Sequence, residues 1–245
     1  MITKNQIKYI NSLQQKKFRV ENQSFIVEGA KSVLELLKSD FKIEMLFVTD
    51  EFFAENENVL QNLPIQEEIA NQADLEKAGS FSSNNAALAI VKTKENEKLL
   101  VQDHEFALIL DDIRDPGNLG TIIRVADWYG IHKIICSHST VDFYNPKVIS
   151  ATMGSFTRSN LYYTDLGSFI KNQSVNVYGT LLDGDNIHKT KFSESGYIVI
   201  GNEANGISQS IEKLITHKIT IPRFGQAESL NAGIATAVVL DNLRR

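Results

Sequence analysis

The feature that most constrains this chain is an alternation of short apolar runs and helical segments that begins at Phe106. Residues 106–111 (FALILD) are apolar up to the last position, and residues 119–129 carry apolar side chains at helical spacing. Strands of a parallel sheet show this pattern, because helices cover both faces of the sheet. We therefore predict an α/β fold with a parallel sheet from residue 106 onward.

The same alternation continues to the end of the chain. Strands are expected at 133–136, 175–182, 197–203 and 218–222, and helices at 146–153, 166–172 and 208–214. The last helix lies within 229–243 and is apolar on nearly every side, so it must be buried on most of its surface. We expect this helix either to thread into the core or to form a dimer interface. The pattern does not determine the order of the strands.

The residues before this alternation predict a second, smaller α/β unit. A charged segment without sustained periodicity, 93–105, separates the two, so we divide the chain into domains 1–97 and 98–245. In the first domain helices are expected at 4–16, from Ala30 onward and at 67–77, and strands at 25–29, 43–49 and 87–93.

Composition restricts the class of protein. Among 245 residues there is one cysteine, Cys136, which excludes an internal disulfide framework and favours the cytoplasm. The longest apolar runs are shorter than the ~18 residues of a membrane span, and the N-terminus lacks the apolar stretch of a signal peptide. The five histidines have no metal-ligand spacing, and we expect no metal.

The distribution of charge is uneven. A net charge of −5 is mildly unfavourable for binding nucleic acid, yet the first twenty residues contain five cations and no acid. We interpret Lys16, Lys17 and Arg19 as candidate phosphate contacts. A solvated basic helix end is an equally good interpretation of the charges alone.

Polar residues follow the first strand of the larger domain. Pro116-Gly117 fits a tight turn in which Gly takes positive φ, and Asn118 then opens a helix. Arg124 on that helix can reach back toward the loop, because helical side chains lean toward the N-terminus. The alternatives are that Asn118 is only a helix cap and that Arg124 pairs with Asp127 on the surface.

A second polar loop follows the strand at 197–203. Gly201 allows a ligand to approach the backbone, and Asn202 and Glu203 offer donors and acceptors. The loop lacks the G-x-G-x-x-G fingerprint of dinucleotide-binding folds, which disfavours a nucleotide-dependent oxidoreductase. The alternative is a glycine-rich turn in which Ser208 caps the next helix.

A third polar loop precedes the last helix. Glu228, Ser229 and Asn231 gather at the positive end of that otherwise apolar helix. The alternative is that Ser229 is only its N-cap.

The three loops together resemble the three signature motifs of the SpoU (TrmH-type) RNA 2′-O-ribose methyltransferases of the SPOUT superfamily. The motifs are NLGTIIRVADWYG (118–130), IVIGNEANGIS (198–208) and IPRFGQAESLNAGIATAVVL (221–240). Each is modest alone, and the triplet is specific. Residues 7–37 are also similar to the small ribosomal-protein-like substrate-binding domain of this family, which favours its rRNA-directed branch over its tRNA-directed branch.

The resemblance implies a C-terminal trefoil knot, an exception to the rule that chains avoid threading. It also implies S-adenosylmethionine bound in the knot, largely by backbone groups, and methylation of a ribose 2′-hydroxyl in RNA. From the apolar character of the 119–129 helix and of the last helix, we predict a homodimer with both helices near its interface. The positions that match the family's catalytic motif residues are Asn118, Arg124, Glu203, Ser229 and Asn231. The positions that match its cofactor pocket are Thr180, Gly201, Ile221 and Leu230.

Because arginine is a poor base, we expect Arg124 to orient the 2′-oxygen or a neighbouring phosphate and to stabilise developing negative charge, while a substrate phosphate takes the proton. Ser229 and Asn231 would position the ribose and Arg124, and Glu203 would hold its loop.

Two departures from the family pattern bear on RNA contacts. Ser150 stands where the family often has Arg, and residues 82–84 (SSN) replace a usual Thr-Pro-Gln turn. A non-catalytic RNA-binding protein on the same scaffold is the main alternative function.

Overall fold

The computed structural model of the chain describes residues 2–61 and 66–245. The chain forms two compact units, one of Met1–Glu95 with Asp142–Thr157 and one of Asn96–Val141 with Arg158–Arg245. The division at residue 98 that the sequence suggests assigns 142–157 to the larger domain, whereas the structure packs this segment with the smaller unit.

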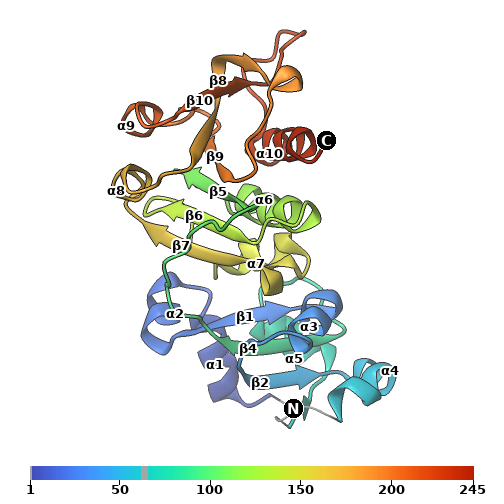
Figure 1. Cartoon of the computed structure of the whole chain (residues 1–245). Coiled ribbons are helices and arrows are strands. Elements are labelled where there is room, and N and C mark those ends of the chain that lie inside the picture. Colours follow the sequence, from blue (N-terminus) through green and yellow to red (C-terminus); the bar gives the residue numbers. More distant parts are fainter. Residues whose placement is uncertain (1, 62–65) are drawn as a thin grey trace. The chain divides into compact units, whose positions relative to one another are not determined.

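The first unit is built on a four-stranded sheet with the order β1-β4-β2-β3. β4 is antiparallel to both of its neighbours, and β3 is parallel to β2. Five helices accompany these strands within the described residues (Figure 1). The elements are α1 (Lys4–Ser12), α2 (Lys16–Asn22), β1 (Ser24–Glu28), α3 (Ala30–Leu37), β2 (Ile43–Val48), α4 (Asp50–Leu60), β3 (Glu68–Ile69), α5 (Gln72–Ala78) and β4 (Ala87–Lys92).

The prediction of one continuous helix at 4–16 is wrong. The chain forms α1 and α2 instead, because Leu13 is buried at the end of α1 and Gln15 is extended. The Arg19 guanidinium donates to the carbonyl oxygens of Leu13 (2.9 Å) and Gln14 (2.8 Å), so the carbonyls at the break have a partner other than a continuing helix. The predicted start of the helix at 67–77 is also wrong, because α5 begins at Gln72 with Asn71 as its N-cap.

The segment 142–157 packs into the first unit through aromatic side chains. It contains α7 (Pro146–Thr152), followed by a 3-10 turn at Ser155–Arg158. The ring of Phe25 on β1 lies 4.6 Å from that of Tyr144 and 6.2 Å from that of Phe156, measured between centroids. Apolar burial of this kind is the main stabilising contribution to a core. The small unit therefore takes part of its core from a segment distant in the sequence.

The second unit contains a six-stranded sheet with the order β10-β8-β9-β5-β6-β7, in which every pair of neighbours is parallel. The predicted α/β fold with a parallel sheet is confirmed. The strands are β5 (Phe106–Asp111), β6 (Lys133–Ser137), β7 (Asn160–Thr164), β8 (Asn176–Asn186), β9 (Gly196–Gly201) and β10 (His217–Thr220). β7 is absent from the sequence-based expectation, because this edge strand is only half-buried and lacks a continuous apolar run.

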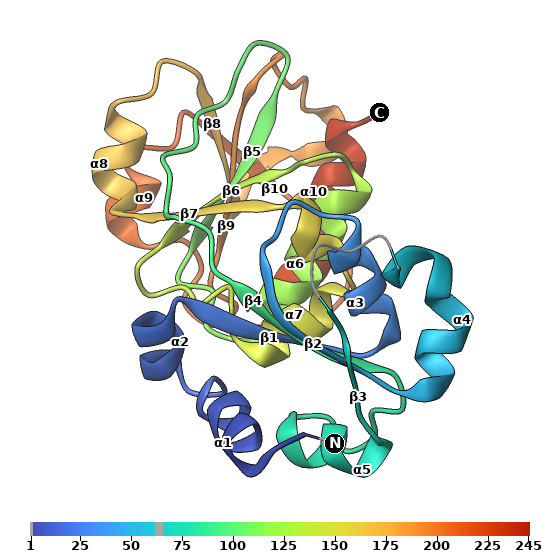
Figure 2. The same ribbon diagram turned by 90° about the horizontal axis from the view of Figure 1, so that it is seen from below.

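Helices cover both faces of this sheet, as Figures 1 and 2 show. α6 (Pro116–Trp128) and α10 (Ala232–Leu243) lie on one face, and α8 (Leu166–Lys171) and α9 (Gln209–Glu212) lie on the other. A β-carbon on Gly233 of α10 would come within 2.7 Å of the Thr121 methyl group of α6. The two helices are therefore in close contact, and the C-terminal helix buries much of its surface there. The trefoil knot itself stays a prediction.

The strand order creates a switch point between β5 and β9. The chain leaves β5 toward β6 and β7, whereas it leaves β9 toward β10 at the opposite edge. Asp111 and Gly201, the last residues of these two strands, are paired across the sheet. Ligands of open α/β sheets bind outside the carboxyl ends of strands at such a point. The first two polar loops begin there.

No helix among the described residues combines the length and apolar character needed to span a bilayer.

Candidate functional site

The loop after β5 enters α6 through an acidic cap. The Asp115 carboxylate accepts a hydrogen bond from the backbone N–H of Asn118 at 2.8 Å, and Pro116 occupies the start of the helix. Proline suits this place because its fixed φ is helical and its missing N–H is not needed. The expected turn at Pro116-Gly117 is therefore wrong, as is the interpretation of Asn118 as the cap. Asn118 lies inside the first turn, and its side chain is free for other contacts.

A chain of three polar side chains joins the three loops. The Asn118 amide donates to the Glu203 carboxylate, and the Asn231 amide donates to the Asn118 carbonyl oxygen at 2.7 Å. Asn118 follows β5, Glu203 follows β9 and Asn231 follows β10. Residues up to 113 positions apart in the sequence thus form one hydrogen-bonded group at the switch point. We call Asn118, Glu203 and Asn231 the polar junction.

Asn231 has a second role as the N-cap of α10. Its side-chain oxygen accepts from the N–H groups of Gly233 (2.9 Å) and Ile234 (3.3 Å). The alternative in which Ser229 caps this helix is wrong. Because the oxygen caps the helix while the nitrogen binds Asn118, the start of α10 is fixed to the start of α6.

The loop after β9 is held by its own side chains. The Asn202 side-chain oxygen accepts from the N–H groups of Ala204 (2.9 Å) and Asn205 (3.2 Å). A β-carbon on Gly201 would lie 2.3 Å from the Gly206 backbone, so glycine is required there by the fold of the loop itself. The Ser208 N–H donates to the buried carboxylate of Asp111 at 2.8 Å. These contacts hold Glu203 at the site.

The loop after β10 is held by fewer hydrogen bonds of its own than the loop after β9. Among the described residues, no backbone–backbone hydrogen bond is formed between positions 222 and 230, and the Arg223 guanidinium donates to the Ala227 carbonyl oxygen at 3.4 Å. Its apolar side chains Phe224 and Leu230 are 96% and 46% exposed. This loop therefore presents backbone groups that lack backbone partners, together with apolar surface, to a ligand.

Comparison with known proteins decides the family. Residues 105–241 match the model of the SpoU rRNA Methylase family, and residues 4–78 match that of the MRM3-like substrate binding domain. The chain belongs to the SpoU rRNA methylase family. This confirms the resemblance seen in the three motifs.

Individual SpoU relatives extend over the whole chain. The 23S rRNA (guanosine(2553)-2′-O)-methyltransferase RlmP of Bacillus subtilis is 31% identical over 98% of this chain and 97% of its own. The AdoMet-bound rRNA methyltransferase of Sinorhizobium meliloti is 29% identical, with a TM-score of 0.89, over 100% of this chain and 95% of that one. Both units are thus shared with these relatives.

In this SpoU methylase domain Arg124 lies outside the polar junction. The side chain is exposed and, among the described residues, forms no hydrogen bond or ion pair. Its expected surface partner Asp127 is instead bound by Arg158, at 2.8 Å. Helical geometry places Arg124 on the same side of α6 as Thr121 and Trp128, away from Asn118. Ser229, also exposed, likewise lies outside the junction. The catalytic roles of Arg124 and Ser229 stay predictions.

The cofactor candidates lie around the same strand ends. Thr180 on β8 donates its hydroxyl to the Val199 carbonyl oxygen at 3.0 Å, so this group ties β8 to β9. Ile221 is half-buried at the start of the unpaired loop, and Leu230 is at its end. Together with Gly201, they stay predicted cofactor contacts.

The basic candidates in the substrate-binding domain divide into two groups. Lys16 and Lys17 are exposed at the start of α2. Arg19 is 3% exposed, and its guanidinium also binds the Asp142 carboxylate at 2.6 Å and 3.0 Å. A buried guanidinium with these partners has no surface to offer a phosphate, so the expectation for Arg19 is wrong. Its partner lies 123 positions away, and no local pattern reveals it.

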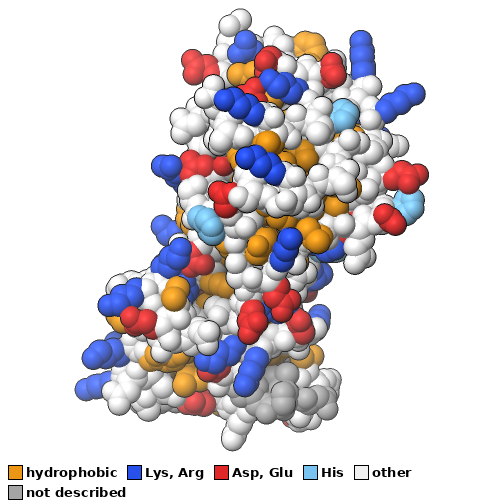
Figure 3. All heavy atoms as spheres, turned by 60° about the vertical axis from the view of Figure 1, so that its left-hand side comes forward, with side chains coloured by type: hydrophobic (Ala, Val, Ile, Leu, Met, Phe, Trp, Pro, Cys, Tyr) orange, Lys and Arg blue, Asp and Glu red, His pale blue; other side chains and the backbone are white. Residues whose placement is uncertain are grey.

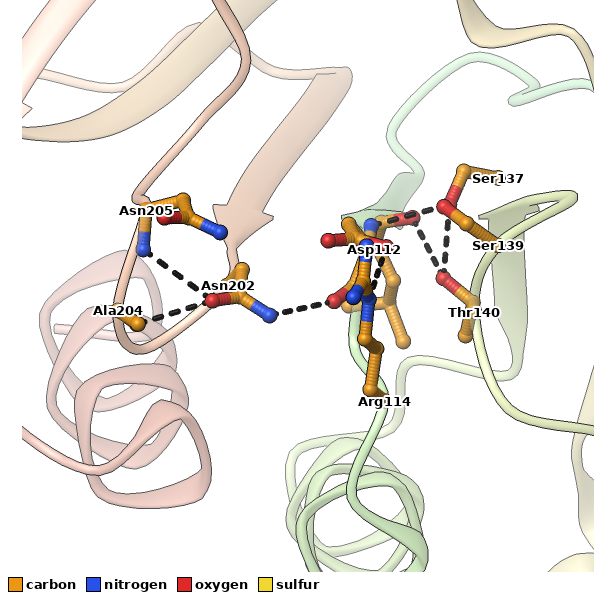
Figure 4. A network of polar contacts seen from close by, with 9 residues as sticks. Asp112, Arg114, Ser137, Ser139, Thr140, Asn202, Ala204 and Asn205 are labelled. Atoms are coloured by element: carbon orange, nitrogen blue, oxygen red, sulfur yellow. Dashed lines mark hydrogen bonds and ion pairs between the residues drawn. The ribbon is translucent and has the colours of Figure 1, made fainter.

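Sequence reasoning missed a network around Asp112, the residue after β5 (Figure 4). Its backbone is bound by Ser137 and Asn202, and its carboxylate by Arg114. Only the position of Asp112 immediately after a buried strand hinted at this role. Among the described residues no group of three His, Cys, Asp or Glu side chains is placed to hold a metal ion, and the expected independence from metal stays a prediction.

Proposed function

We propose that this chain transfers a methyl group from S-adenosylmethionine to a ribose 2′-hydroxyl of RNA, with 23S-type rRNA as the substrate. The observation that carries the proposal is the polar junction, which three motif loops assemble at the switch point of the sheet. The relatives from Bacillus subtilis and Sinorhizobium meliloti, which match 98% and 100% of this chain, are rRNA methyltransferases by name, which supports rRNA over tRNA.

The loop after β10 fits the cofactor. Its backbone groups without backbone partners suit recognition through N–H and C=O, and the exposed Leu230 and Phe224 suit an adenine ring. We assign cofactor contacts to Thr180, Gly201, Ile221 and Leu230. When bound, S-adenosylmethionine supplies an activated methyl group, so the protein must supply orientation and a reactive oxygen.

Arg124 is the residue that acts on the 2′-oxygen. An arginine side chain stays protonated at physiological pH, so it serves as a donor rather than as a base. Its exposed guanidinium, without a partner among the described residues, is available to orient the oxygen and stabilise developing negative charge. A phosphate of the substrate then takes the proton.

The polar junction positions the reacting groups. Glu203 holds Asn118, and Asn231 holds both Asn118 and the start of α10. This arrangement fixes the end of the loop after β10. That end presents Ser229 and Asn231 to the ribose. In the first unit, Lys16 and Lys17 supply phosphate contacts that deliver the RNA, without a part in the chemistry.

The protein works as a homodimer in the cytoplasm. Apolar side chains are exposed on both helices of the α6–α10 pair, with Trp128 84% and Ile234 54% exposed. Exposed large apolar groups on neighbouring elements mark protein interfaces, and two-fold dimers are the commonest oligomers. The single cysteine, which is buried, supports the cytoplasm. Light scattering at micromolar concentration should give twice the chain mass, and a monomer would contradict the dimer.

The function is tested by mapping 2′-O-methylated positions in total RNA from cells with and without the gene. One rRNA position should lose its methyl group and regain it when the gene is restored. Purified protein should bind S-adenosylmethionine and transfer labelled methyl to unmethylated 23S rRNA. Binding of RNA without transfer would identify a non-catalytic RNA-binding protein, and transfer to tRNA alone would overturn the proposed substrate.

A further inference from the structure

Asp112 is held in an uncommon conformation by contacts with β6 and with the loop after β9. Its φ is +62°, in the left-handed region that L-residues other than Asn and Asp seldom adopt. Its N–H donates to the Ser137 hydroxyl at 3.0 Å, and its carbonyl oxygen accepts from the Asn202 amide at 2.9 Å. Figure 4 shows these partners on opposite sides of Asp112. Strained residues that neighbours hold from several directions gather at functional sites.

The carboxylate of Asp112 holds Arg114. It accepts a hydrogen bond from the Arg114 Nε at 2.8 Å. This bond lowers the pKa of the Asp112 carboxyl below its ordinary value, and a hydrogen bond from Ser139 lowers it further. The carboxylate is therefore charged across the physiological range.

Both sequence neighbours of Arg114 are anchored in the fold. Ile113 is fully buried, and its carbonyl oxygen accepts from the Val141 N–H at 2.8 Å. Asp115, on the other side, caps α6. Arg114 stands between these two anchors with its side chain 70% exposed.

The terminal nitrogens of Arg114 are available. Among the described residues only the Nε of this guanidinium forms a hydrogen bond, so the edge formed by the two Nη groups faces no protein acceptor. Two parallel N–H groups match the paired oxygens of a phosphodiester. A guanidinium whose rotation is already restricted loses less entropy when it binds such a group.

The loops around the site carry more acidic than basic side chains. The loops after β5, β9 and β10 contain Asp112, Asp115, Glu203 and Glu228, and their only cations are Arg114 and Arg223. Figure 3 shows Lys and Arg side chains scattered among acidic ones over the face that it presents. An RNA strand near the polar junction therefore needs a local cation, and Arg114 is fixed in the loop that leads to Asn118.

We propose that Arg114 binds a phosphate of the RNA strand next to the methylated ribose, and that Asp112 is the positioning residue that aims it. This inference rests on the function proposed above. It adds a substrate-binding residue that acts on RNA rather than on the cofactor.

The test compares Arg114→Ala, Asp112→Asn, the double variant and Lys171→Ala as a control. Asparagine tolerates the left-handed backbone and removes the charge that holds Arg114. Lys171 is an exposed cation of the same unit, on α8. Measurements are methyl transfer to an rRNA fragment with kcat and KM separated, the salt dependence of RNA binding, S-adenosylmethionine affinity and Tm.

We expect Arg114→Ala to raise KM for RNA about tenfold, the loss typical of one charge-assisted hydrogen bond, with kcat changed much less. The slope of log affinity against log salt should fall by about 0.7, the value for one phosphate contact on a single strand. Asp112→Asn should give part of the same KM rise, and the double variant should add little to Arg114→Ala. The cofactor affinity and Tm of these variants should match those of the wild type. The control Lys171→Ala should match the wild type in every measurement.

Three results would overturn the inference. They are an unchanged salt slope in Arg114→Ala, a loss of cofactor affinity with normal RNA binding, and full additivity of the two substitutions. If the wild-type protein methylates no RNA at all, the proposed function fails instead. The two failures are therefore distinguishable.

Discussion

Arg19 in α2 and Arg124 in α6 look equivalent in the sequence, since each is a cation in a segment with a candidate role in RNA methylation. In the structure they differ in burial and in hydrogen bonding. Arg19 is 3% exposed and donates to Asp142 and to two backbone carbonyls. Arg124 is exposed and has no hydrogen-bond partner among the described residues.

The difference shows two uses of a guanidinium. It stabilises the fold when its N–H donors bind protein acceptors, and it is available to a ligand when they do not. A buried arginine stabilises the protein only because each charged donor has a partner, and removal of either partner is costly. An exposed arginine without a partner adds little to stability and can meet a substrate.

Arg124→Ala should reduce single-turnover methyl transfer by about 10²–10³, because that is the usual cost of removing a stabiliser of developing charge. Tm and S-adenosylmethionine affinity should be unchanged. Arg124→Lys should also be largely inactive, since an ammonium group lacks the planar fork that holds two oxygens. Retention of more than roughly a tenth of the wild-type rate in Arg124→Ala would be too small a loss for this role.

Arg19→Ala should lower the free energy of unfolding by about 3 kcal/mol, because it leaves the Asp142 carboxylate and two backbone carbonyls without their donor. Urea denaturation measures this change, and Lys17→Ala is the matched control on the exposed side of the same helix. Where Arg19→Ala stays folded, its RNA affinity should be normal. Normal stability with weakened RNA binding would reverse our assignment of Arg19.

Replacement of both Lys16 and Lys17 by Ala should have the smallest effect. Both side chains are exposed, so stability should change by less than about 0.5 kcal/mol. RNA affinity should fall. The slope of log affinity against log salt should decrease in magnitude by roughly 1.4, the value expected for two phosphate contacts on a single strand. Titration of labelled rRNA fragments at several salt concentrations measures both quantities. An unchanged slope would make this segment a solvated helix end.

Much of the larger domain could be predicted from local patterns. The continuous apolar run at Phe106–Asp111 and the helical spacing after it predicted a buried parallel strand and a covering helix, and both are present. β7 escaped prediction because an edge strand buries too little to need an apolar run. The expected turn at Pro116-Gly117 failed because the same two residues also suit a helix start, and the Asp115 cap decided between them.

The sequence by itself determined the fold class, the family and the three loops that carry the candidate site, because these depend on periodicity and on short motifs. Only the tertiary structure decided which polar groups meet. The bonds from Asn118 to Glu203, from Asn231 to Asn118 and from Arg19 to Asp142 join residues 85, 113 and 123 positions apart. Partners at such separations are chosen by the order of strands and by the packing of segments, and burial then determines whether a charged group is held in the protein or left for a ligand.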